Sequence, residues 1–372
     1  MMNNSQRSKS GDTLDPRVLT VVLALAIFEF EIFTFTRGLV EIAGQDAVIT
    51  TFLGGTLLIL LTALLVKLSR RFPGESFFAY SKKVWGKPMG LVIIASYLFY
   101  FYTFMVLLFQ NFANANRLIY LQETPALIPL ILMGLGAVWL VSYGFSSIVR
   151  FFQLFYPFFA ITIIVVLLLG IREVQFENFF PILSRGIIPV LHGAIVYVGF
   201  IQGVEVLLFV TPFLNDKNKI LKPALGGIFA VILFSVFASV NAIGVLGAEN
   251  TVEFIYPGIA LLSAIELPGF AVERFELLLT LTWLIAIFTT MAIYIYLLSF
   301  GIIELFGLSH RKLTIGLVTA AIIGATYLIP NVTWMLVLRE YYNYFTLIFI
   351  AVIPALTFLM AVIRGKEANE HA

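Results

Sequence analysis

Residues 16–40 read PRVLTVVLALAIFEFEIFTFTRGLV, an apolar segment that carries two carboxylates, Glu29 and Glu31, near its middle. Residues 189–213 read PVLHGAIVYVGFIQGVEVLLFVTPF and carry a third carboxylate, Glu205, at a comparable position. An ionised carboxylate inside a bilayer is energetically costly and is usually retained for a function. The two segments head the two halves of the chain. They therefore predict a transporter-like core with a ligand or ion site near the middle of the membrane.

The composition of the whole chain indicates a polytopic membrane protein. Of its 372 residues, 60% are hydrophobic and 12% are charged, about half the charged share of a soluble domain. The polar N-terminus lacks the pattern of a signal peptide, so we expect the first apolar segment to be retained as a span. The net charge of +2 gives no indication of nucleic-acid binding. The absence of cysteine excludes disulfides and thiolate chemistry.

The apolar segments predict an all-α fold of ten transmembrane helices, since about 20 apolar residues cross a bilayer as a helix. Residues 1–15 and 365–372 are expected to be tails around one membrane domain, residues 16–364. The predicted spans are Pro16–Val40, Ala47–Leu68, Gly90–Leu118, Ala126–Tyr143, Ile148–Gly170, Pro189–Phe213, Pro223–Leu246, Phe275–Leu305, Leu313–Pro330 and Tyr342–Ile363.

Basic residues between the predicted spans indicate the orientation. With the N-terminus in the cytoplasm, 17 of the 23 lysines and arginines fall on the cytoplasmic side, as the positive-inside rule requires. Most of them lie in the segments Lys67–Lys87 and Lys217–Lys222. An even number of spans then predicts both termini in the cytoplasm.

The ten spans divide into two sets of five, residues 16–170 and 189–363, which we interpret as an inverted repeat. The first and sixth spans occupy equivalent places, and the sixth is rich in glycine, with Gly193, Gly199 and Gly203. Discontinuous helices at corresponding positions are typical of inverted-repeat transporters, because unwound backbone offers free amides and carbonyls to a substrate. We therefore predict that both spans are interrupted.

Candidate ligand-binding residues are polar or aromatic side chains inside the predicted spans. Glu29 and Glu31 are separated by about 200° on a regular helix, so either one faces a cavity and the other a neighbouring helix, or the helix is unwound there. The alternative for each carboxylate is a bond to a neighbouring helix. The predicted set is Glu29, Glu31, Tyr97, Tyr100, Phe101, Gln202, Gly203, Glu205, Thr290 and Tyr294.

Other sequence features bear on the function class. Residues Pro257–Leu267 are mildly apolar and too short to span, which predicts a short outer helix, either a lid or a purely interfacial element. Nothing resembles a nucleophile elbow, a P-loop or a cluster of metal ligands. We therefore expect no catalysis, no cofactor and no bound metal.

An ordered set of short motifs covers nearly the whole chain. Along the chain they are Gly44-Gln45-Asp46-Ala47, Arg70-Arg71-Phe72-Pro73-Gly74, Glu123-Thr124-Pro125, Asn178-Phe179-Phe180-Pro181, Gly203-Val204-Glu205, Tyr256-Pro257 and Glu273-Arg274-Phe275-Glu276 before Trp283. In this order they resemble the spore germination receptor B subunit, the spore permease branch of the amino acid–polyamine–organocation superfamily.

The resemblance implies a ten-span, inverted-repeat protein of the bacterial spore inner membrane. It also implies partners, namely the A and C subunits of a germination receptor, and a small nutrient ligand such as an amino acid that triggers germination. The family usually has a glycine-rich break in the first span, whose place is taken here by Glu29-Phe30-Glu31. Carboxylates at that place would oppose a ligand carboxylate and favour a cation, a proton or a neutral polyol.

Two other interpretations stay open on the sequence. The chain could be a proton-coupled amino acid or amine permease, or a scaffold whose pocket binds nothing. Uptake of labelled substrate by the chain alone would favour the permease. Neighbouring genes for A and C subunits would favour the receptor.

Overall fold

The computed structural model describes residues 13–31, 34–117, 123–264 and 276–367, without the side chains of residues 29–31, 262–264 and 276–280. Within this part the chain forms helices joined by loops, one isolated backbone bridge and no strand. The predicted all-α class is confirmed. The helices are α1 (Val18–Glu31), α2 (Phe35–Ala43), α3 (Ala47–Arg71), α4 (Phe77–Trp85), α5 (Lys87–Ala115), α6 (Leu127–Ser142), α7 (Phe145–Gly170), α8 (Ile187–Phe200), α9 (Val206–Val210), α10 (Leu221–Asn241), α11 (Ala248–Glu253), α12 (Pro257–Ala264), α13 (Glu276–Phe306), α14 (Arg311–Thr326), α15 (Val332–Leu347) and α16 (Ile353–Ile363).

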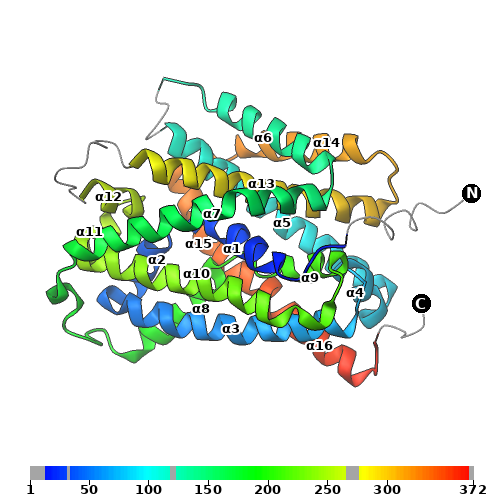
Figure 1. The fold of residues 1–372 in the computed structure, drawn as a ribbon, viewed down its shortest axis with the longest axis horizontal. Helices are drawn as coiled ribbons and strands as arrows, with labels where there is room; N and C mark the ends of the chain where they lie inside the picture. Colours follow the sequence, from blue (N-terminus) through cyan, green and yellow to red (C-terminus); the bar gives the residue numbers. More distant parts are fainter. Residues whose placement is uncertain (1–12, 32–33, 118–122, 265–275, 368–372) are drawn as a thin grey trace, which may run out of the picture.

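Most helices run along the long axis of a single bundle (Figure 1). In the described part, six helical stretches are long and apolar enough to cross a bilayer: Phe35–Arg71, Lys87–Ala115, Phe145–Glu173, Lys217–Leu246, Leu281–Phe306 and Val332–Ile363. Three shorter apolar helices accompany them, at Val18–Phe28, Leu127–Ser142 and Ile187–Phe200. The chain is therefore an integral membrane protein.

Helix α1 lies in the centre of the bundle. It is apolar on every side, and Leu19, Val22 and Leu25 are fully buried. Such a helix suits a position surrounded by other helices, and α1 contacts α7, α9, α10 and α13. The first carboxylate-bearing segment is thus the core element of the fold.

In the part of the chain that the structure describes, each predicted apolar segment contains helix, and the first and last segments add detail to the prediction. The last segment begins at Val332 rather than Tyr342, because the charged pair Arg339 and Glu340 interrupts the apolar run without interrupting the helix. In the first segment, residues Glu29–Glu31 are helical and belong to α1, so of the two alternatives for these carboxylates the structure has the regular helix. The next helix, α2, starts at Phe35.

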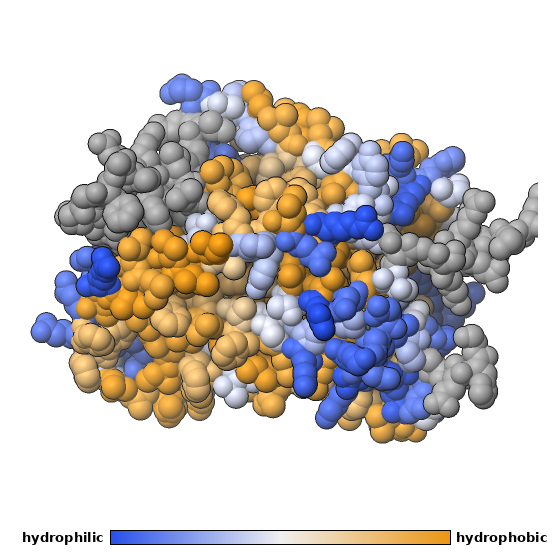
Figure 2. Space-filling view, viewed as in Figure 1, coloured by the Kyte–Doolittle hydropathy of each residue, from blue (hydrophilic) through white to orange (hydrophobic). Residues whose placement is uncertain are grey.

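One end of the bundle, which we call the basic end, gathers the loops that the sequence predicts on one side. Figure 2 shows hydrophilic residues over the end where α4 and α9 lie. Leu14 pairs with the segment after α9 through backbone bonds to Phe213 and Asn215 of 2.9 and 3.0 Å. Nearby, a hydrogen bond from Lys219 lowers the pKa of the Asp216 carboxyl. The N-terminal segment and the Lys217–Lys222 loop are therefore neighbours.

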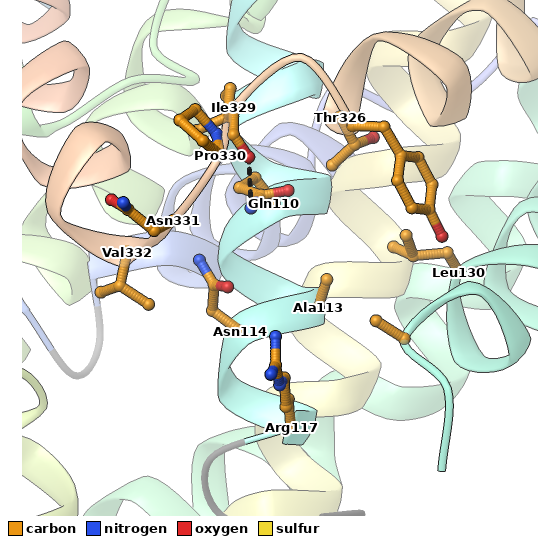
Figure 3. Close-up of a pocket in the computed structure, with 12 residues that line it drawn as sticks. Gln110, Ala113, Asn114, Arg117, Leu130, Thr326, Ile329, Pro330, Asn331 and Val332 are labelled. Atoms are coloured by element: carbon orange, nitrogen blue, oxygen red, sulfur yellow. Dashed lines mark hydrogen bonds between the residues drawn. The ribbon is translucent and has the colours of Figure 1, made fainter.

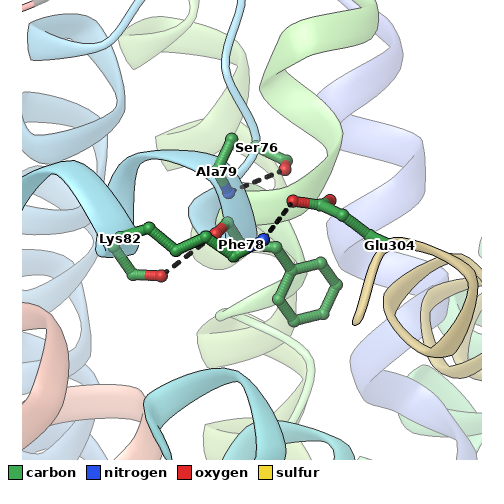
Figure 4. Close-up of polar contacts among 6 residues, drawn as sticks. Ser76, Phe78, Ala79, Lys82 and Glu304 are labelled. Atoms are coloured by element: carbon green, nitrogen blue, oxygen red, sulfur yellow. Dashed lines mark hydrogen bonds and ion pairs between the residues drawn. The ribbon is translucent and has the colours of Figure 1, made fainter. Parts of the chain in front are cut away.

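Helix α4, which the sequence analysis missed, ties the basic end together. The Ser76 hydroxyl accepts a bond from the Ala79 amide and begins the helix, a usual N-cap. Lys82 then forms a 3.3 Å ion pair with Glu304 of α13 (Figure 4), and Arg364 donates to the Val84 carbonyl. Helix α4 thus connects α13 to the C-terminal segment.

At the opposite end, two of the family-like motifs meet. The Gln45 amide donates to the Pro181 carbonyl at 2.7 Å, and the buried Asp46 carboxylate accepts from the Leu183 amide at 2.9 Å. The predicted outer helix is present as α12, Pro257–Ala264, and the rest of its predicted length lies outside the described residues. Beside it, the Tyr256 hydroxyl donates to Asn111 of α5 at 3.0 Å.

Candidate functional site

The sixth predicted span is interrupted where its carboxylate lies. Helix α8 ends at Phe200 and α9 starts at Val206, with turns between them. Gly203 adopts φ +111° there, a conformation that residues with a side chain rarely adopt. A Cβ atom at Gly203 would also lie 2.8 Å from the Ala26 carbonyl oxygen of α1. Glycine is needed for the turn and for the close approach of the first span.

The Glu205 carboxylate, fully buried, is the centre of a hydrogen-bonded group. One oxygen accepts from the Tyr294 hydroxyl of α13 at 2.6 Å and from the Tyr100 hydroxyl of α5 at 3.1 Å. The other accepts from the Gly203 amide at 2.9 Å. Three donors suit an ionised carboxylate, which can only accept. The group joins α5, α13 and the break of the sixth span.

Aromatic rings enclose this group. Phe101 contacts the Tyr294 ring edge-to-face, with centroids 5.3 Å apart. The Tyr100 ring lies between Phe349 and Tyr342, stacked at 4.5 and 5.6 Å. All five rings are buried. The Glu205 group is therefore closed in this structure, and a ligand would enter only after these rings move.

Tyr97 does not bind Glu205; its hydroxyl bonds to an irregular turn in the tenth span. Residues Ile348–Val352 form a π-helical turn, in which the Ile353 amide bonds to the Ile348 carbonyl. The next bond of this type would come from Pro354, which has no N–H. The Tyr97 hydroxyl instead donates to the Phe349 carbonyl at 2.6 Å. It satisfies a backbone group that the π turn and proline leave without a donor.

Gln202 connects the break to α15 rather than to Glu205. Its amide donates to the Gly199 carbonyl at 2.9 Å, to Asn343 at 3.3 Å and to Thr346 at 3.4 Å. Its own carbonyl oxygen is buried and accepts no hydrogen bond within the described residues. The break thus contains one polar atom whose bonding capacity is unused.

Thr290 binds the first span, one helical turn from Tyr294. Its hydroxyl donates to the Leu25 carbonyl of α1 at 3.1 Å. The side chains of Glu29 and Glu31, two of the predicted site residues, lie outside the described residues. The structure therefore groups Tyr100, Phe101, Gly203, Glu205 and Tyr294, while Tyr97, Gln202 and Thr290 lie at its margins.

Sequence reasoning missed the contribution of α15. Its buried residues Met335, Arg339, Tyr342 and Thr346 recur every three to four positions, which is the period of a helix face. This pattern was available in the sequence. Arg339 is 5% exposed and lies over the Phe104 and Tyr342 rings at 5.9 and 6.0 Å, which places a cation among the aromatic residues around Glu205.

Comparison with known families decides the identity. The family model described as "Spore germination protein" matches residues 13–333. The chain belongs to this family. Its relatives in Bacillus subtilis (strain 168) include spore germination protein YndE, 25% identical over 77% of this chain and 79% of the relative. Spore germination protein A2 is 27% identical over 72% and 73% of the two chains.

Solved structures show the fold that this germination protein shares. Mhp1, a nucleobase-cation-symport-1 family transporter in a closed conformation with bromovinylhydantoin bound, matches with a TM-score of 0.65 at 14% identity, over 93% of this chain and 78% of Mhp1. MhsT in complex with L-phenylalanine matches with the same score and identity, over 95% and 89%. At this identity the likeness shows a transporter-like membrane fold and nothing about substrate.

Proposed function

We propose that this spore germination protein is the B-type, germinant-sensing subunit of a nutrient receptor. It would bind a small nutrient, such as an amino acid, in a transporter-like pocket around Glu205 and thereby trigger germination. We propose the spore inner membrane as its location, A and C receptor subunits as its partners, and no catalytic activity. Family membership supports the germination role.

The Glu205 group is the observation that carries the ligand-binding proposal. Its carboxylate is buried at a helix break and held by two tyrosine hydroxyls and one backbone amide. A ligand ammonium or hydroxyl could replace a tyrosine as a donor to Glu205, and the freed hydroxyl could bind the ligand. Because the tyrosines belong to α5 and α13, this exchange would alter the packing of both helices. Ligand binding would thus be coupled to a change in the bundle.

Contacts between the predicted halves support the ten-span inverted repeat, residues 16–170 and 189–363, as one membrane domain. Spans in equivalent places touch one another: α1 with α9, α3 with α10, α5 with α13 and α6 with α14. Such pairs are expected next to a pseudo-twofold axis. The first span contains two helices, α1 and α2, and the sixth contains α8 and α9, which supports the predicted correspondence of these two spans.

The test of the Glu205 site is a nutrient dose response in spores. Glu205→Gln and Tyr294→Phe should shift the nutrient concentration for half-maximal germination at unchanged protein abundance. Tyr197→Phe is the matched control, since it removes another buried hydroxyl, on α8. Loss of abundance with an unaltered dose response would contradict a ligand site and leave a structural role.

Glu29 and Glu31 are proposed to tune the ligand class. Carboxylates near the break would favour an ammonium group and oppose a bare carboxylate. Replacing both with glycine should change which nutrients of a panel elicit germination. An unchanged rank order at normal abundance would assign both residues to helix packing instead.

We propose an orientation with both termini in the cytoplasm, and the gathering of basic loops at one end supports it. Because the chain has no cysteine, single cysteines report accessibility directly. A cysteine at Asn218 should be protected from an impermeant reagent added outside intact cells, and one at Glu249 should be labelled. Labelling of Asn218→Cys from outside would refute the orientation.

Proton-coupled transport of amino acids or amines is the second candidate function. The transporter-like fold and the buried carboxylate favour it. Proteoliposomes containing this chain alone would take up labelled substrate in response to a proton gradient. Uptake abolished by Glu205→Gln would favour the permease over a purely sensory subunit.

A further inference from the structure

A cavity at the end opposite the basic end, lined by both polar and apolar residues, is separate from the Glu205 group. It has a volume of about 370 Å³ and lies between the ends of α5, α6, α14 and α15 (Figure 3). This volume is in the lower part of the range of about 300–1,000 Å³ that small-molecule sites occupy. Asn114 in its wall follows Tyr100 on α5 by 14 residues, about 21 Å along a helix. The cavity is therefore distinct from the site proposed above.

One face of the last turns of α5 supplies its polar groups. Gln110, Asn114 and Arg117 follow one another at helical spacing, and their side chains line the same space (Figure 3). Asn114 is 9% exposed, and its only described hydrogen bond is a 3.4 Å contact from its amide nitrogen to the Met335 sulfur. Its carbonyl oxygen has no donor within the described residues.

Arg117 gives the cavity a positive charge at its mouth. Within the described residues the guanidinium forms no ion pair or hydrogen bond. Gln110 donates to the Ile329 carbonyl at 3.4 Å, which leaves its carbonyl oxygen available as an acceptor. Ala113, Leu130 and Val332 provide apolar walls. A guanidinium binds a carboxylate through two parallel bonds, and the amide oxygens would accept bonds from an ammonium or hydroxyl group.

We propose that this cavity is a second ligand site, for a small molecule that carries both a carboxylate and a hydrogen-bond donor, of which a free amino acid is the simplest class. The carboxylate binds Arg117, the donor binds the carbonyl oxygens of Asn114 and Gln110, and the side chain lies against the apolar wall. The proposal stands independently of ligand binding at Glu205. A negative result at this cavity would leave the Glu205 proposal unaffected, and a negative result at Glu205 would leave this proposal unaffected.

The test uses a single cysteine, Ala113→Cys, in the purified full-length chain. Its modification is followed with an anionic reagent, sulfonatoethyl methanethiosulfonate, and a cationic one, trimethylammonioethyl methanethiosulfonate. Adding Arg117→Gln should lower the anionic-to-cationic rate ratio about three- to tenfold, the effect of one nearby charge at intermediate dielectric. Arg172→Gln, which removes an exposed arginine elsewhere, should leave the ratio unchanged.

Protection experiments then identify the ligand class. L-serine and L-leucine at millimolar concentration are each compared with their carboxylate-free counterparts, ethanolamine and isoamylamine. The amino acids should slow modification of Ala113→Cys, the amines should not, and Arg117→Gln should abolish the protection. A cysteine in place of Glu249, an exposed residue of α11, controls for direct effects on the reagent.

Four results would overturn the proposal. The first three are a rate ratio unaffected by Arg117→Gln, equal protection by amines and amino acids, and protection by phosphate alone. Slow modification of Ala113→Cys that occurs only in membranes containing other receptor subunits would also overturn the proposal, because another subunit would then cover the cavity. Val332→Cys, from another wall of the cavity, repeats the test if Ala113→Cys does not fold.

Discussion

Substitution of Gly203 tests the physical basis of the helix break. Gly203→Ala places a Cβ atom at φ +111° and 2.8 Å from both the Ala26 carbonyl oxygen and an Ile27 side-chain carbon. A residue held in such a sparsely populated conformation costs about 1–3 kcal/mol. Overpacking against α1 costs about 1–3 kcal/mol more. We therefore expect a loss of about 2–6 kcal/mol in folding stability, the sum of these two costs.

Two other glycines separate these contributions. Gly186 has φ +81° with nothing near its missing Cβ, and Gly324 lies in α14 with open space around it. Gly186→Ala should therefore show only the backbone cost. Gly324→Ala should be neutral or stabilising, by about 0.5–1 kcal/mol, since alanine is the better helix former.

The assay is thermal unfolding of the purified full-length variants, with protein abundance in membranes as a second measurement. We expect Gly324→Ala to have the highest melting temperature, Gly186→Ala an intermediate one and Gly203→Ala the lowest. If Gly203→Ala melts together with Gly186→Ala, the close approach of α1 to the break contributes nothing. The inference that glycine is needed at position 203 for the close approach of α1 would then be refuted.

Three further experiments test contacts outside the Glu205 group. Tyr97→Phe leaves the Phe349 carbonyl without its 2.6 Å donor, so it should cost about 1–3 kcal/mol in folding stability. The nutrient dose response of the remaining receptor should be unchanged. A shifted dose response would instead place Tyr97 in the ligand site. Lys82→Ala and Glu304→Ala, with their double mutant, should give a coupling energy of about 0.2–1 kcal/mol that weakens in high salt; a zero coupling energy would show that the 3.3 Å pair contributes nothing. Asn331→Ala removes the N-cap of α15 and should lower stability by about 0.5–2 kcal/mol, whereas Asn331→Asp, which keeps an acceptor, should melt near the unsubstituted chain.

The sequence by itself determined the all-helical membrane class, because apolar run length is a local property that a bilayer selects directly. It also predicted an interruption in the sixth span from the glycines Gly193, Gly199 and Gly203, and the structure placed that interruption at Gly203. The length of the apolar run also placed the start of the tenth span incorrectly, at Tyr342 rather than Val332. Arg339 and Glu340 suggested a loop, yet Arg339 is buried and lies over aromatic rings in the bundle.

Only the tertiary structure decided which polar residues meet. Tyr100, Glu205 and Tyr294 are far apart in sequence, and their hydrogen bonds depend on how α5 and α13 pack around the break. Tyr97 and Thr290 carry similar chemistry one turn away, but they satisfy backbone carbonyls of Phe349 and Leu25 instead. A sequence shows that a buried hydroxyl needs a partner. The packing of the helices decides whether that partner is a side chain or a backbone carbonyl.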